Sequence, residues 1–299
     1  MPYFSYHGGH SGQYCRHAKD SLRAVVLRAI EQGFTHYGLS EHCPRDRAQD
    51  LYDDEDGLSP SDLARLFEDY AREARQLQEE FAGDIELLVG LETERLPPSS
   101  WAGRMGQLRD RIDADYLVGS VHEVDGTWVD YSAELTAEAA EACGGVEALR
   151  VRYFDALTEL VTTLRPEVVG HLDLVRRFDG HELKFTRTEL AAATATLEAA
   201  REVGAVLDVN AGPARRGFGP VYPSPELLTL ACEMDVGVTL GDDSHGVDAV
   251  GVGLDACLAA IAAAGYQRVH YLGRVDGETT LLDTPLEAVV PSTGQPITE

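Results

Sequence analysis

The chain has 299 residues, of which 44% are apolar, enough for a sizeable core, and without a linker or repeat it is expected to form a single domain over 1–299. Its formal net charge of −26 disfavours nucleic acid as a partner. The five cysteines are scattered, and neither a secretion signal nor an apolar run of membrane-spanning length occurs, so we expect a cytoplasmic protein that does not insert into membranes.

Short apolar runs typical of strands alternate with amphipathic stretches typical of helices. We expect strands at 3–6, 35–39, 86–91, 116–121, 168–172, 205–209, 236–240 and 268–272. We expect helices at 21–32, 61–81, 146–164, 188–203, 225–232 and 247–264. The core is expected to end near residue 275, with an irregular tail after Leu282 that is rich in Pro and Thr. Such alternation favours a parallel α/β sheet.

Motifs that end in histidine or a carboxylate lie near the ends of most of these strands. In chain order they are His7-Gly-Gly-His10, Cys15-Arg-His17, Ser40-Glu-His42, Gly90-Leu-Glu92, Gly119-Ser-Val-His122, Gly170-His171-Leu-Asp173 and Asp243-Ser-His245. Imidazole and carboxylate groups are common metal ligands. Only a closed ring of strands brings so many strand ends to one centre, so we predict a (β/α) barrel with a metal cluster at its C-terminal face.

These motifs, in this order, resemble those of the PHP (polymerase and histidinol phosphatase) superfamily. The likeness is greatest to its histidinol-phosphate phosphatases, and it includes the segment from Asp208-Val-Asn210 through Arg215-Arg-Gly to Tyr222-Pro-Ser224. The resemblance implies a distorted, TIM-like (β/α)7 barrel that holds three divalent ions, and zinc, manganese or iron would suit the donors.

The resemblance also implies a ligand set for each ion, with one carboxylate bridging two of them. The first set would be His7, His10, Glu92 and Asp243. The second would be Glu92, His122 and His171. The third would be His17, His42 and His245. Cys15, next to the third set in sequence, is expected to be a small buried side chain rather than a thiolate ligand.

The first motif departs from the family's His-x-His pattern. His7 and His10 are three residues apart, and in a regular strand such residues face opposite sides. Gly8 and Gly9 must therefore bulge or turn if both histidines are to reach one metal. The alternative is that His7 is not a ligand.

The implied activity is the metal-dependent hydrolysis of L-histidinol phosphate, a small phosphomonoester, in histidine biosynthesis. A hydroxide that bridges the first two ions would attack phosphorus. Arg215 would clamp the phosphate, with Arg216 as its competitor. Asp243 and His245 are the candidates for protonating the leaving group. Further candidates for substrate contacts are Glu123, Asp130 and Asn210, and Glu94 could accept a histidine N–H or form a salt bridge.

Two other functions remain open at this point. One is a PHP phosphoesterase for nucleotides or oligonucleotides, which should have a more cationic, base-stacking channel. The other is a metal-bound module without turnover, which an incomplete ligand set would favour. The oligomeric state is also left open.

Overall fold

The protein is described by a computed structural model that covers residues 1–179, 184–217, 219 and 221–290. Seven parallel strands form one sheet, in the order β1-β2-β3-β4-β7-β8-β9. Their bounds are Phe4–Ser5, His36–His42, Glu86–Glu92, Tyr116–Gly119, Val168–Val169, Val206–Asn210 and Val238–Gly241.

The first and last strands of this sheet come together. The Tyr6 amide donates to the Leu240 carbonyl oxygen at 2.9 Å, and the Asp243 amide donates to that of His7 at 2.7 Å. These bonds nearly close the sheet into a barrel. The predicted distorted seven-stranded barrel is therefore confirmed.

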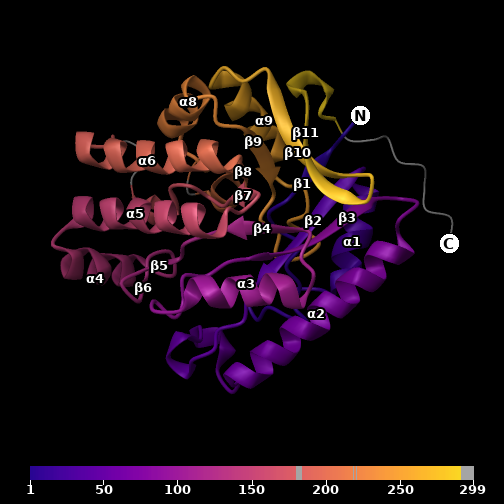
Figure 1. Cartoon of the computed structure of the whole chain (residues 1–299), viewed down its shortest axis with the longest axis horizontal. Coiled ribbons are helices and arrows are strands. Elements are labelled where there is room, and N and C mark those ends of the chain that lie inside the picture. The colour runs from indigo at the N-terminus through magenta and orange to yellow at the C-terminus, as the bar shows by residue number, and fades with distance from the viewer. Residues whose placement is uncertain (180–183, 218, 220, 291–299) are drawn as a thin grey trace.

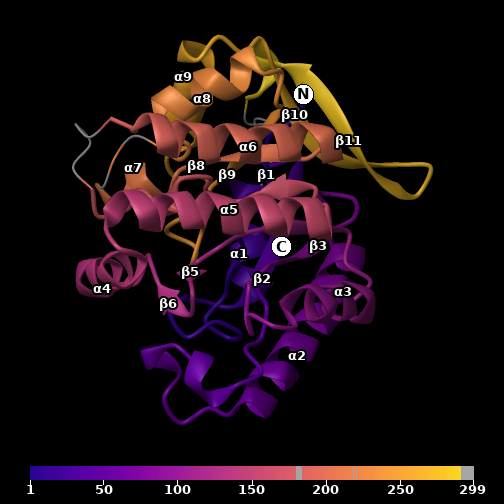
Figure 2. The ribbon, with the colours of Figure 1, turned by 60° about the vertical axis from the view of Figure 1, so that its left-hand side comes forward.

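The longer helices surround the strands (Figures 1 and 2). In chain order, α1 to α9 are Leu22–Glu31, Pro60–Glu80, Trp101–Arg111, Ala133–Cys143, Val146–Leu164, Arg187–Val203, Gly212–Arg216, Pro225–Glu233 and Leu254–Ala263. Helix α2 begins where Ser59 and Asp62 cap each other and Pro60 occupies the first turn. No helix in the described part of the chain is long and apolar enough to cross a membrane.

Several elements differ from the sequence-based expectation. Helices α3 and α4 were not predicted. Helix α9 begins at Leu254 rather than 247, because Gly251 and Gly253 have φ of 73° and 92°, values that interrupt a right-handed helix.

The eighth expected strand does not join the barrel. It is β10 (Arg268–Val275), which pairs antiparallel with β11 (Glu278–Pro285) in a hairpin that projects from the barrel (Figure 2). The prediction of an irregular tail after Leu282 is thus wrong for 283–285, which belong to β11, and a 3₁₀ turn (Leu286–Ala288) follows. Residues 291–299 of that tail lie outside the described residues.

Tyrosine side chains fill the barrel interior beneath the strand ends. The Tyr116 hydroxyl donates to the carbonyl oxygen of Tyr6 at 2.9 Å. Gly90 leaves space for this ring, since a Cβ there would lie 2.5 Å from Tyr116 Cε1. The Tyr37 hydroxyl donates to the Asp242 carboxylate at 2.9 Å. The barrel interior is therefore filled by packed side chains, and the side chains at the strand ends pack against them.

Candidate metal centre

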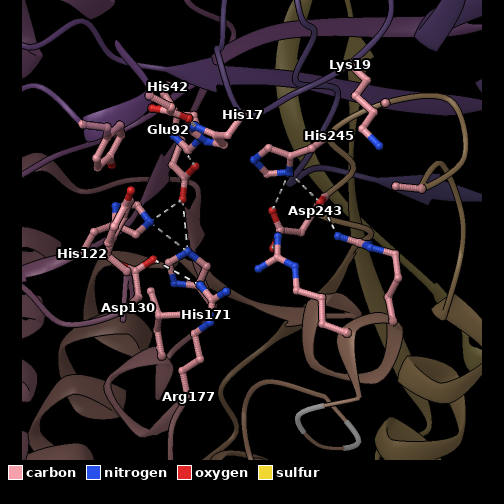
Figure 3. A pocket seen from close by; sticks show the side chains of 18 of the residues that line it. His17, Lys19, His42, Glu92, His122, Asp130, His171, Arg177, Asp243 and His245 are labelled. Atoms are coloured by element: carbon pink, nitrogen blue, oxygen red, sulfur yellow. Dashed lines mark hydrogen bonds and ion pairs between the residues drawn. The ribbon is translucent and has the colours of Figure 1, made fainter. Parts of the chain in front are cut away.

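Glu92, the last residue of β3, lies at the centre of the histidines (Figure 3). It is almost fully buried, with 1% of its surface exposed. Its carboxylate oxygens lie 3.0 to 3.2 Å from ring nitrogens of four histidines: His7, His42, His122 and His171. Burial would raise the pKa of Glu92, but His7, His122 and His42 lower it well below its usual range. The geometry fits a carboxylate that bridges neighbouring cations.

The strand-end donors form compact sets, within each of which the ligand atoms lie within 4.8 Å of one another. One set is His7, His10 and Asp243. Two sets include the central carboxylate: His7, Glu92 and His171, and His10, His42 and Glu92. The fourth is Cys15, His17, His42 and His245. The structure thus brings all nine predicted ligands into one region, counting His122 beside Glu92. Cys15 is buried as expected, yet its sulfur belongs to the fourth set.

The donor chemistry of this region fits bound divalent cations. His17 Nε2 and His42 Nε2 face each other at 3.2 Å, as do the Nε2 atoms of His122 and His171. Burial, together with the charge of nearby His10, lowers the pKa of His17 and His42. His17 and His42 are thus two neutral imidazoles whose lone pairs converge, an arrangement that is matched by a cation between them. The buried Nε2 of His10 likewise lacks a hydrogen-bond partner among the described residues.

The Gly8-Gly9 pair makes the turn that the spacing of the first motif requires. Gly8 has φ of 141° and Gly9 has φ of 74°. Their amides donate to the hydroxyls of Ser40 and Ser244, both at 3.0 Å. A Cβ on Gly8 would lie 2.3 Å from Asp242 Oδ1, so the turn leaves no room for a side chain. This turn brings His7 and His10 into one donor set with Asp243.

A cavity of about 550 Å³ opens above these donors. Its cationic lining residues are Lys19, Arg177, Arg215 and Arg216. Its acidic lining residues, apart from Glu92 and Asp243, are Asp20, Asp54, Asp130 and Asp248. Two tyrosines, Tyr52 and Tyr131, also line it. The donors therefore lie at the wall of a space that has groups for both an anion and a cation.

Comparison with known proteins identifies the family. The PHP domain model matches residues 7–212. The chain belongs to the PHP domain family.

Its relatives include histidinol-phosphatases from several organisms. The "Probable histidinol-phosphatase" of Schizosaccharomyces pombe is 37% identical, over 84% of this chain and 83% of the relative. The "Histidinol-phosphatase" of Bacillus subtilis is 26% identical, over 82% of this chain and 95% of the relative.

A solved structure agrees with the fold. Histidinol phosphate phosphatase from Lactococcus lactis, crystallised with zinc, L-histidinol and phosphate, superposes with a TM-score of 0.72 at 21% identity, covering 93% of this chain and 98% of that chain. The PHP barrel is thus found over most of the present chain.

In this PHP barrel, the predicted substrate residues separate into two groups. Arg215, Arg216 and Asp130 line the cavity. Glu123 and Asn210 are not among its lining residues, and substrate contacts for them stay a prediction. Glu123 is buried, and its Oε1 lies 3.7 Å from Nη1 of Arg95. Asn210 is also fully buried, because its amide group is bonded within the barrel rather than turned to the cavity: it donates to Asp208 at 2.8 Å and accepts from the Gly212 amide at 2.7 Å.

The two neighbouring arginines differ in what they contact. Arg215 donates to the carbonyl oxygens of Asp242 and Asp243, the latter at 2.7 Å. Asp243 has φ of 49°, so these bonds hold the ligand-bearing turn in an uncommon conformation. Arg216 is more loosely placed, with Nη2 4.0 Å from Asp243 Oδ2. Arg216 therefore makes fewer close contacts than Arg215 on the cavity wall.

Carboxylates that lie next to the Nδ1 atoms of several donor histidines fix the orientation of these rings. Asp208 Oδ2 lies 2.6 Å from His7 Nδ1, and Glu41 Oε1 lies 3.1 Å from His10 Nδ1. Sequence reasoning missed the roles of both carboxylates, although Asp208 is an ionisable residue inside an apolar strand and Glu41 lies within the Ser40-Glu-His42 motif. Glu94, which was proposed to accept from a histidine, has Oε1 2.9 Å from His122 Nδ1. Such partners select the ring tautomer and strengthen the ligand.

Proposed function

We propose that this protein is a histidinol-phosphatase that hydrolyses L-histidinol phosphate to L-histidinol and inorganic phosphate, in histidine biosynthesis. The observation that carries the proposal is the ring of buried donors around Glu92 at the wall of a cavity that also presents arginines. Relatives named histidinol-phosphatase, at 26% to 37% identity over most of the chain, support this substrate.

We assign three divalent ions to the donors. His7, His10, Glu92 and Asp243 would hold the first, Glu92, His122 and His171 the second, and His17, His42 and His245 the third. Zinc, manganese and iron all suit these ligands, and zinc is the metal in the Lactococcus lactis protein. When bound, such ions supply an activated water and neutralise charge on the phosphoryl group. Asp243 and His245 then act in catalysis as ligands rather than as proton donors.

The protein's own side chains bind and orient the substrate. Arg216 contacts the phosphoryl oxygens, because a guanidinium can donate two parallel hydrogen bonds to them. Arg215 acts indirectly by holding the Asp242-Asp243 turn. L-Histidinol also carries an ammonium and an imidazole, and Asp130 on the cavity wall is placed to accept from one of them.

A comparison of substrates tests the proposal. The purified protein, with its metal content measured, would be assayed with L-histidinol phosphate, AMP and an aryl phosphate. We expect kcat/KM to be at least about 100-fold higher for L-histidinol phosphate, because only this substrate offers both an anionic phosphate and a cationic ammonium to the charged residues that line the cavity. A preference for AMP would instead establish a nucleotide phosphoesterase. Bound metal without turnover of any of the three would favour a non-catalytic module.

A further inference from the structure

Among the donors of the third site, His17 is the exposed one, because the side chains of His42 and His245 are only 11% and 16% exposed. The His17 side chain is 37% exposed, whereas those of His7 and His10 are fully buried. His17 lies in the loop before α1, and the cavity reaches it directly. Solvent would therefore reach an ion at this site from the side of His17.

The carboxylate behind His17 also differs from its counterparts. Asp208, Glu41 and Glu94 are each at most 2% exposed and belong to, or directly follow, barrel strands. For His17 the nearest carboxylate is Asp54, whose Oδ2 lies 3.3 Å from Nδ1 and whose side chain is 34% exposed. Asp54 comes from a 3₁₀ turn (Asp53–Glu55) outside the barrel.

The contact with Asp54 involves only one of the two ring nitrogens of His17. Nδ1 lies within ion-pair distance of Asp54, 3.3 Å from its Oδ2, and Nε2 faces His42 Nε2 at 3.2 Å. A carboxylate at Nδ1 favours the tautomer that carries its proton there and leaves Nε2 free to bind a metal. Asp54 is thus placed to prepare His17 as a ligand.

Contacts of its neighbours with buried residues hold the turn that carries Asp54 in place. The buried Arg45 forms an ion pair with Glu55, and its guanidinium carbon lies 4.4 Å from the centre of the Tyr52 ring. The Tyr52 hydroxyl donates to Glu94 at 2.9 Å. The position of Asp54 is therefore set by a surface turn that is tied to the centre through Tyr52.

From these contacts we propose that Asp54 is a positioning residue for the third ion, and that this ion is the most weakly held and most readily exchanged of the three. The inference rests on the metal assignment in the proposed function. We attribute the weaker binding of the third ion to the exposed position of both His17 and Asp54. Water and competing chelators reach this pair more easily than the buried pairs.

Metal titration of the intact protein with zinc and a competing chelator tests this inference. For the wild type we expect one ion to dissociate at a lower chelator concentration than the other two. Asp54→Asn should weaken that ion by about 10- to 100-fold and leave the other two unchanged. Asp56→Asn removes the same charge from an exposed neighbour and should leave all affinities unchanged. Asp54→Glu should restore part of the lost affinity.

A double variant identifies the site that is affected. If Asp54 acts through His17, then adding Asp54→Asn to His17→Gln should cause no further loss of metal. Unchanged zinc affinity in Asp54→Asn, or equal weakening of all the ions, would overturn the inference. Because zinc binding is measured without substrate, such a result would leave the histidinol-phosphatase proposal standing. A wild-type protein that binds no metal would instead refute both.

Discussion

Two adjacent arginines on the cavity wall have different contacts, and this difference assigns them different tasks. Arg215 bonds to two backbone carbonyl oxygens, whereas Arg216 lies beside the Asp243 carboxylate without a close contact to it. A sequence motif places both residues near the site but does not say which one faces the substrate. Their hydrogen bonds separate a positioning role from a binding role.

Alanine substitutions of the two arginines should therefore have different consequences. Arg216→Ala should lower kcat/KM by about 10²- to 10³-fold through loss of phosphate contacts, with the metal content and Tm unchanged. Arg215→Ala should lower the free energy of unfolding by roughly 1 to 3 kcal/mol and weaken metal binding, because two carbonyls lose their donor and the Asp243 turn loosens. Steady-state kinetics, metal analysis and denaturant unfolding measure these effects. Loss of activity in Arg215→Ala with full metal content and stability would restore Arg215 as the phosphate clamp.

At the scale of elements, the Gly8-Gly9 turn determines whether the first metal site can form. The spacing of His7 and His10 indicated that a turn was needed, and the φ angles of the two glycines provide it. The spacing did not predict how closely this turn is packed. Asp242 and Ser244, which follow β9 and are distant in sequence, lie against Gly8.

Substitution of Gly8 should affect both stability and metal binding. Gly8→Ala adds a Cβ that would lie 2.3 Å from Asp242 Oδ1, in addition to an unfavourable backbone conformation. The matched control is Gly57→Ala, whose φ is 82° but whose Cβ would meet no atom within 4 Å. We expect about 1 to 2 kcal/mol of destabilisation for Gly57→Ala, and roughly 1 to 3 kcal/mol more for Gly8→Ala together with a lower metal content. Equal effects of the two changes on unfolding and on metal content would contradict this account of the turn.

The elements that sequence reasoning missed have weak local patterns. Helix α3 contains Gly103 and Gly106, which lower helix propensity, and α4 buries mainly Ala139 and Ala140, so it lacks a clear apolar stripe. The run that forms β10 has the composition of a barrel strand, but its neighbour along the chain is β11, and this local pairing keeps it outside the barrel. Propensity and periodicity report local structure and do not report which partner a strand selects.

At the scale of the whole molecule, the ligand cluster joins segments from both ends of the chain. His7 and Asp243 come from opposite ends of the barrel sequence, and the nearly closed sheet brings them together. Bound ions would therefore stabilise the folded state as a whole, because the unfolded chain has no assembled site.

Removal of metal should accordingly lower the thermal stability of the protein. An ion present at 100 times its Kd contributes about 2.7 kcal/mol, so we expect chelation to lower Tm by roughly 5 °C or more. Re-addition of zinc should restore Tm, and calorimetry with parallel metal analysis measures both changes. An unchanged Tm after verified loss of all metal would show that the barrel closes without help from the cluster.

The sequence by itself determined the alternation of strands and helices, the barrel and the ligand types, because these depend on local periodicity and on motifs at strand ends. Glu92, for example, stood out as a candidate ligand from its place after an apolar run, and the resemblance to the PHP family implied its bridging role. Only the tertiary structure decided that Asp208 supports His7, that Arg215 holds a turn and that Asp54 faces His17. These contacts join residues far apart in the chain, and the packing of the barrel and of the 53–55 turn, rather than any local pattern, sets their distances.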